Sequence, residues 1–133
     1  MSFSIYVNVE SHLLYVHGHG EITAADIDQY YASLKATSGI NHCCKALINL
    51  ASEGVSLEQA PIKNIKSLGR LFKHNPILPE GSKMAIVVRS SLAFGFVRLF
   101  MATRGEHVTI RPFKNMDKAM FWLQVTEEDF QYH

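Results

Sequence analysis

The residues with the clearest chemical potential are two histidines, His17 and His19. On a strand, this spacing places both imidazoles on one face, where they could begin a metal site. A zinc site needs at least three protein ligands, and only Glu21 stands close by as a third. We therefore predict no metal site and no cofactor. The other histidines are scattered, and we expect them on the surface: His12, His42, His74, His107 and His133.

The sequence contains no local signature of catalysis. A typical serine hydrolase shows Gly-x-Ser-x-Gly, and many nucleotide-binding enzymes show a glycine-rich phosphate loop. Neither pattern occurs, and Gly18-His-Gly20 lacks the rest of a dinucleotide fingerprint. We therefore predict a protein that is not an enzyme, with no catalytic residues. A site assembled from distant residues would leave no local trace, so that alternative stays open.

The only cysteines, Cys43 and Cys44, are adjacent. Neighbouring side chains on a strand point to opposite faces, so these two are poorly placed to form a disulfide. We predict two buried thiols that act as small hydrophobic side chains.

Length and composition predict a single globular domain over residues 1–133. Hydrophobic residues make up 47% of the chain and charged residues 19%, which is enough apolar material for one core. The first residues lack the regions of a secretory signal, and no apolar run approaches the roughly 20 residues that span a bilayer. These features predict a cytoplasmic protein with no transmembrane segment.

The net charge is only +1, but the charge is unevenly distributed. Residues 43–114 carry eleven Lys or Arg against four Glu, whereas residues 1–42 and 115–133 each carry one Lys against four acidic residues. Such asymmetry is typical of a solvated helix face, or of a face that meets acidic partners, anionic lipid or nucleic acid. Nucleic acid is the least favoured partner, because the basic residues lack interleaved exposed aromatic side chains.

Apolar periodicity predicts five strands. Residues 3–9 alternate apolar and polar side chains, and residues 12–20 read as a second strand after a turn, which indicates a β-hairpin over residues 3–18. Short, mostly apolar stretches indicate buried strands at residues 43–50, 83–89 and 107–113.

Helical spacing predicts four helices between and after these strands. They are expected after Thr23 up to Gly39, at 56–74, at 92–103, and from Asn115 or Asp117 onward. The order ββαβαβαβα predicts an α/β fold with a mixed, mostly parallel five-stranded sheet and an antiparallel opening hairpin.

Several stretches of the chain carry a resemblance to a known family. They are Gly18-His-Gly-Glu-Ile-Thr23, Ala46-Leu-Ile-Asn-Leu50, Met84-Ala-Ile-Val-Val88, Phe94-Gly-Phe-Val-Arg-Leu-Phe100 and Lys118-Ala-Met-Phe-Trp-Leu123. Over nearly all its length the chain resembles the SpoIIAA-like branch of the STAS (anti-sigma-factor antagonist) domains, whose fold is also similar to that of the lipid-binding CRAL-TRIO domains. The resemblance implies a STAS-like fold and a regulatory or interaction role.

The loop after the central strand departs from the signalling members of that family. Those members carry an Asp-Ser-Ser-Gly type motif whose serine is phosphorylated by a partner kinase. Here the stretch reads Asn49-Leu-Ala-Ser-Glu-Gly-Val-Ser56, and the motif is absent. Neither Ser52 nor Ser56 is therefore carried over as a phosphorylation site.

The carboxyl ends of the parallel strands are the first place to expect a ligand, because open α/β sheets bind ligands in the crevice beyond those ends. Serines that open a helix, with an arginine beside them, could bind an anion through backbone N–H groups, although plain helix capping is the simpler explanation. These strand ends supply Ser52, Glu53, Arg89, Ser90 and Ser91.

The segment 92–103 is apolar nearly all round, which predicts a helix that is sandwiched or partly covered by a partner. Arg98 lies within it, at the arginine of the family's Gly-x-x-Arg pattern, and we expect it to form a structural ion pair. Phe94 is a candidate for a ligand wall or an oligomer contact, with core packing as the default.

Two functions remain open. The first is a non-enzymatic STAS-like regulatory or protein-interaction module that forms a homodimer through the helix 91–103. The alternative is a small-molecule or lipid carrier with an apolar pocket between the sheet and the helices 56–74 and 91–103. That pocket would be lined by Phe72, Phe94, Leu99 and Phe100, with a basic rim for an anionic head group from Lys66, Arg70 or Lys73.

Overall fold

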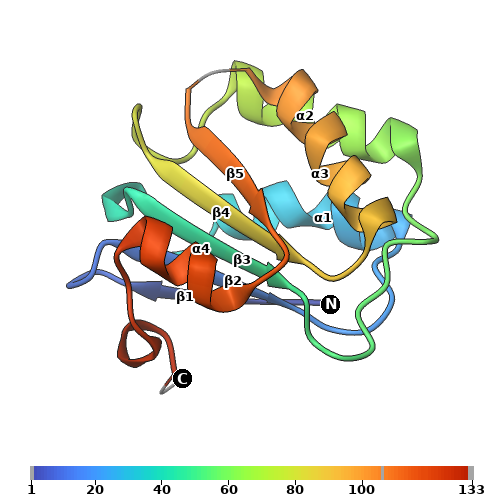
Figure 1. Ribbon diagram of the computed structural model, residues 1–133. Coiled ribbons are helices and arrows are strands. Elements are labelled where there is room, and N and C mark those ends of the chain that lie inside the picture. Colours follow the sequence, from blue (N-terminus) through green and yellow to red (C-terminus); the bar gives the residue numbers. More distant parts are fainter. Residues whose placement is uncertain (1, 106, 132–133) are drawn as a thin grey trace.

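A computed structural model describes residues 2–105 and 107–131 and contains one five-stranded sheet. The strands lie side by side in chain order (Figure 1). The first pair is antiparallel, and every later pair is parallel. The predicted α/β fold with a mixed sheet is confirmed. The strands are β1 (Phe3–Asn8), β2 (Leu13–Gly18), β3 (Lys45–Leu50), β4 (Lys83–Val88) and β5 (Thr109–Phe113).

Three helices cover one face of the sheet and a fourth covers the other (Figure 1). Parallel strands that follow chain order, joined by crossovers of one hand, place all the crossover helices on the same face. None of the described helices has the length and hydropathy needed to cross a membrane. The helices are α1 (Ala24–Lys35), α2 (Ile62–His74), α3 (Ser91–Arg104) and, on the opposite face, α4 (Met116–Leu123).

The middle residues of β3 and β4 are apolar because both faces of these strands are buried. On β3, Ala46 and Ile48 face α1–α3, whereas Leu47 lies in the core under α4. On β4, Ala85 and Val87 lie under α4, whereas Met84, Ile86 and Val88 face the other helices. This two-sided burial explains why β4 reads as a continuous apolar run rather than as an alternating one.

The first helix begins where the sequence indicates. Thr23 caps α1, and its Oγ1 accepts a hydrogen bond of 3.3 Å from the backbone N–H of Asp26. The Asp26 carboxylate accepts four hydrogen bonds in return, from the backbone N–H and hydroxyl groups of Thr23 and of Ser2. Burial alone would raise the pKa of Asp26, but these hydrogen bonds outweigh it and lower the pKa to about 2.

We expect stability to fall as the pH drops from about 4 to about 2, in part through Asp26. The unfolded chain binds this proton first, because its Asp pKa is near 3.9, so the contribution is present above that pH and is lost below it. The expected loss is about 1–2 kcal/mol after solvent screening. Urea unfolding at pH 5 and pH 2.5 measures it. The free energy of unfolding of Asp26→Asn should fall much less between the two pH values than that of wild type. The free energy of unfolding of Asp117→Asn should fall as much as that of wild type.

The second helix is shorter than the predicted segment 56–74, because α2 begins only at Ile62. Pro61 is its N-cap, with φ −70° and ψ 136°, and a proline holds the residue before it in extended conformation. Residues 51–61 instead form an irregular segment, called here the strap. The strap is hydrogen-bonded to the end of the hairpin, from Ile22 N to Ser56 O (2.9 Å) and from Ser56 N to Gly20 O (3.1 Å).

The prediction of two buried thiols is wrong for one cysteine. Cys43 is buried and Cys44 is exposed, and both are free. Neither belongs to β3, because a short 3-10 turn at Ile40–His42 precedes them and the strand begins at Lys45. Burial, together with the neighbouring Cys44, raises the pKa of the Cys43 thiol to about 11, so this thiol is protonated at neutral pH.

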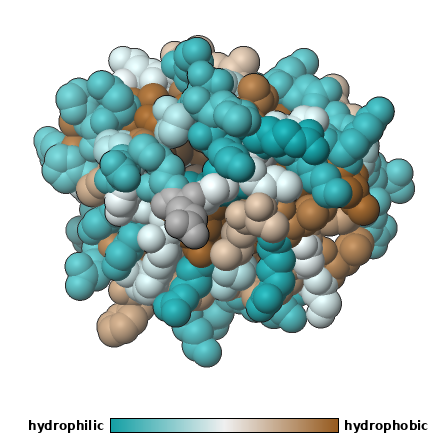
Figure 2. All heavy atoms as spheres, turned by 90° about the horizontal axis from the view of Figure 1, so that it is seen from above, coloured by the Kyte–Doolittle hydropathy of each residue, from teal (hydrophilic) through white to brown (hydrophobic). Residues whose placement is uncertain are grey.

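Helix α3 is covered on one side only within the described chain, so it is not sandwiched, and the alternative that a partner partly covers it stays a prediction. Ala93 and Val97 are buried against the core, whereas Gly95 and Arg98 are exposed. Leu92 is 51% exposed. Figure 2 looks down on this side of the molecule and shows a mainly hydrophilic surface with hydrophobic side chains between.

Candidate functional site

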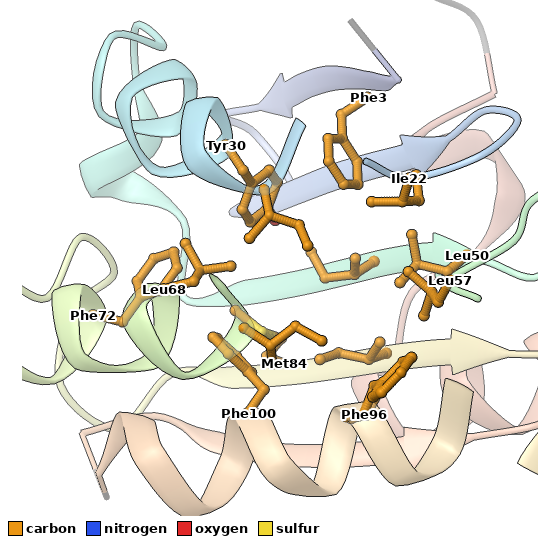
Figure 3. A pocket seen from close by; sticks show the side chains of 15 residues that line it. Phe3, Ile22, Tyr30, Leu50, Leu57, Leu68, Phe72, Met84, Phe96 and Phe100 are labelled. Carbon is orange, nitrogen blue, oxygen red and sulfur yellow. The ribbon is translucent and has the colours of Figure 1, made fainter. Parts of the chain in front are cut away.

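An apolar recess lies between the sheet and helices α1–α3. Its volume is about 100 Å³, and no polar atom contributes to its wall. Figure 3 shows the fifteen lining side chains around one shared space. Apolar cavities of this kind stay dry, and an engineered one of about 150 Å³ binds benzene. The lining side chains include Phe3, Leu57, Leu68, Phe72, Phe96 and Phe100.

Aromatic rings in mutual contact frame the recess. Phe72 on α2 meets Phe100 on α3 edge to face, with ring centroids 5.8 Å apart. Phe3 on β1 lies 4.8 Å from Tyr30 on α1. Each ring is held by a neighbour from another element, so the shape of the recess is set by packing rather than by one flexible side chain. Burial raises the pKa of Tyr30, so its hydroxyl is neutral at physiological pH.

The strap covers one end of the recess. Leu57 lies beside Leu50 at that end, on the opposite side of the space from Phe72 (Figure 3). Ala60 of the strap is buried in an apolar cluster with Ile22 and residues of α1 and α2. An irregular segment that closes a cavity through apolar contacts and two backbone hydrogen bonds opens more readily than a helix packed on a sheet.

Four aromatic and aliphatic residues were expected around a pocket, and two of them line this recess. They are Phe72 and Phe100, whereas Phe94 and Leu99 lie outside it. The Phe94 ring lies instead between two cations, with the Arg98 guanidinium 5.1 Å and the Lys114 ammonium 5.6 Å from its centroid. Helix α3 turns Val97 and Phe100 inward, which directs Phe94 toward the end of β5.

Arg98 does not form the expected ion pair with any described residue. Its side chain is exposed, and its guanidinium packs over the ring of Phe94. Because one side of α3 faces solvent, the charge needs no carboxylate partner, and the stacking on Phe94 covers the apolar part of the arginine.

The basic residues expected at a pocket rim lie on α2, and none of them lines the recess. Arg70 and Lys73 are exposed and Lys66 is half-buried. The inward stripe of α2 consists of Ile65, Leu68 and Phe72, and the basic residues lie on other sides of the helix.

The strand-end residues have mainly local contacts. Ser90 caps α3, and its Oγ accepts a hydrogen bond of 3.1 Å from Ala93 N. The ammonium of Lys114 donates to Ser91 Oγ at 3.4 Å. Arg89 and Glu53 are exposed. That these residues contact a ligand stays a prediction. The described contacts of Ser90 and Ser91 are all with other residues of the same chain.

Relatives do not explain the recess or the strand ends. The chain matches no protein-family model, no curated protein and no solved structure. Its function has to follow from the chemistry of its own residues.

A second group of polar side chains lies at the carboxyl ends of β2 and β3. Nε2 of His17 lies 2.5 Å from Ser52 Oγ, and the imidazole rings of His17 and His19 are 4.5 Å apart. Nε2 of His19 in turn lies 2.7 Å from Ser4 Oγ. Among the described residues, no group of three or more His, Cys, Asp or Glu side chains is arranged to hold a metal ion.

Sequence reasoning named His17 and His19 as a pair and Ser52 as a strand-end candidate, but it did not place Ser52 beside His17. The spacing of His17 and His19 predicted that their rings lie together, but Ser52 is far away in the chain. The parallel pairing of β2 with β3, which places His17 opposite Asn49, brings Ser52 within reach. The remaining histidines lie elsewhere: His12, His42 and His74 are exposed, His107 is half-buried, and His133 is outside the described residues.

Proposed function

We propose that this protein binds a small apolar molecule, or the hydrocarbon part of an amphipathic one, in the recess. The observation that carries the proposal is an entirely apolar wall around a recess of about 100 Å³. Protein interiors are close-packed, so side chains that line such a recess have fewer contacts than those in a filled core. A ligand that fills the space recovers lost contacts and stabilises the folded state.

The size and chemistry of the recess limit what enters it. Pockets that enclose a whole drug-sized molecule are larger, at about 300–1,000 Å³. The recess therefore takes one aromatic ring or a short alkyl segment, and any polar part of the ligand stays outside. A polar atom inside would lose its hydrogen bonds to water without a replacement, because the wall supplies none.

A STAS-like regulatory or protein-interaction role is the alternative proposal. It is supported by the sequence resemblance and by the order of strands and helices around a mixed sheet. Homodimerisation through the helix 91–103 would use the exposed side of α3, where Leu92 is the one large apolar side chain that is more exposed than buried. We prefer ligand binding because the recess draws its wall from many elements, whereas this side of α3 offers little apolar area.

Titration with toluene and with octanoate tests ligand binding, and the amide signals in NMR spectra report it. Wild-type protein should bind at least one of them saturably, with shifts at recess residues. Leu57→Trp should weaken binding at least 10-fold, because the larger ring fills the recess from the strap. Leu71→Trp, the same change at an exposed position of α2, should bind as wild type.

Two results would contradict the proposal: no saturable binding of either probe, or equal binding by Leu57→Trp and wild type. Native mass spectrometry of protein purified without added ligand distinguishes the alternative. A retained small molecule supports ligand binding, whereas a ligand-free dimer that Leu92→Asp dissociates supports the interaction module.

A further inference from the structure

Ser52 and His17 have the geometry of a nucleophile and its base. β2 and β3 end at the same edge of the sheet (Figure 1), and Ser52 is the second residue after β3. The 2.5 Å separation of Ser52 Oγ and His17 Nε2 is a direct hydrogen bond of the kind that activates a serine. Both residues are half-buried, so a reactant reaches them from solvent.

The surroundings of His17 favour its neutral, basic form. Burial, and then the charge of the neighbouring His19, lower the pKa of His17, so the imidazole has a free lone pair at neutral pH. His19 is held in place through Ser4, at 2.7 Å. A histidine that stays neutral and faces a hydroxyl is suited to accept its proton.

The backbone after Ser52 supplies donors for a developing negative charge. Ser52 opens a tight turn, in which Val55 N donates to Ser52 O at 3.2 Å and Gly54 has a φ of +86°. Within the described residues, the N–H groups of Glu53 and Gly54 have no hydrogen-bond acceptor. Free N–H groups beside a nucleophile stabilise the oxyanion formed when it attacks a carbonyl group.

We propose that Ser52 and His17 catalyse the hydrolysis of carboxylic esters through an acyl intermediate on Ser52. The hydrogen bonds that join the cluster involve hydroxyl and imidazole groups, which serve as nucleophile and base in acyl transfer by serine hydrolases. His17 lies on the face of the sheet opposite the recess, because β2 alternates Val16 toward α1–α3 with Tyr15 and His17 toward α4.

The reaction proceeds in two balanced steps. Ser52 Oγ attacks the ester carbonyl carbon while His17 Nε2 takes the hydroxyl proton. The bond to the alcohol oxygen then breaks, and His17 returns the proton to the departing alcohol. A water molecule next attacks the acyl group, His17 again takes a proton, and cleavage of the bond to Ser52 Oγ releases the carboxylic acid as His17 reprotonates Ser52.

Labelling with diisopropyl fluorophosphate, followed by intact-mass and peptide analysis, tests the nucleophile. Wild-type protein should form one adduct, located on Ser52, and should hydrolyse p-nitrophenyl acetate faster than the buffer does. Ser52→Ala should form none, and His17→Gln should label about 100-fold more slowly. Ser56→Ala, a serine-to-alanine change in the same strap, should label at the wild-type rate.

The proposal is overturned if wild-type protein is not labelled, if the adduct lies on another residue, or if His17→Gln labels as fast as wild type. Urea unfolding and toluene titration of each variant separate loss of the pair from loss of the fold. Because the recess lies across the sheet, a variant that binds toluene normally but is not labelled has lost only the Ser52–His17 chemistry.

Discussion

Replacing Gly69 with alanine should lower the free energy of unfolding by about 2–3 kcal/mol. Gly69 lies where α2 crosses α3, and a Cβ there would overlap Thr103 Oγ1 and lie 2.8 Å from Thr103 Cβ. Thr103 cannot simply rotate away, because its hydroxyl donates to the carbonyl oxygens of Leu99 and Phe100 at 3.2 and 3.0 Å. The two helices would have to separate, which also disturbs Phe72 and Phe100 at the recess.

Gly95 provides the matched control, because it is a glycine in the interior of the neighbouring helix, and a Cβ there would meet no atom within 4 Å. Gly95→Ala should raise the free energy of unfolding by about 0.5–1 kcal/mol, through helix propensity and a less flexible unfolded chain. Urea unfolding measures both variants. If Gly69→Ala matched wild type, the close helix crossing described above would be wrong.

Replacing Arg104 with methionine should cost about 2–3 kcal/mol. Arg104 is only 5% exposed at the end of α3, and its Nη1 donates to the carbonyl oxygens of Gly105 (2.5 Å) and Val108 (2.8 Å). Burial lowers the pKa of Arg104, yet an arginine stays protonated at neutral pH, so these carbonyl groups compensate a buried charge. Methionine keeps an apolar stem but leaves both acceptors without this donor.

Arg98→Met is the control for Arg104, because Arg98 is exposed on the same helix. It should change stability by less than about 0.5 kcal/mol. Hydrogen exchange adds a local measurement: Arg104→Met should accelerate exchange of the Thr109 amide, which donates to Ser82 O where β5 begins. A variant as stable as wild type would show that relief of the buried charge offsets the lost hydrogen bonds.

The recess and the Ser52–His17 pair use opposite faces of the same sheet. The recess needs side chains on the face under α1–α3, and His17 needs the opposite face of β2. Alternation along the strand lets both exist without shared residues, since neighbouring side chains point to opposite faces. Substitutions of His17, or of recess residues on α2 and α3, should therefore leave the other site intact.

Features that depend on neighbours a few residues apart could be predicted from the sequence. Thr23, one of Ser90 and Ser91, and one of Asn115 and Asp117 were expected to start helices, because a short polar side chain can reach backbone N–H groups two or three residues on. The structure has Thr23, Ser90 and Asn115 as the N-caps. The apolar run of β4 indicated a strand buried on both faces. The predicted helix 56–74 starts too early, because α2 begins only after Pro61, which is its N-cap.

The two candidate sites could not be predicted from the sequence, because each depends on tertiary packing. Phe72 and Phe100 were expected at a pocket from their apolar spacing, but Phe94 fits the same spacing and lies outside, because helix rotation against the sheet selects which residues face inward. Ser52 meets His17 only through the pairing of β2 with β3. Capping and periodicity act over one or two turns of chain, whereas a void or a nucleophile–base pair depends on how side chains distant in sequence pack together.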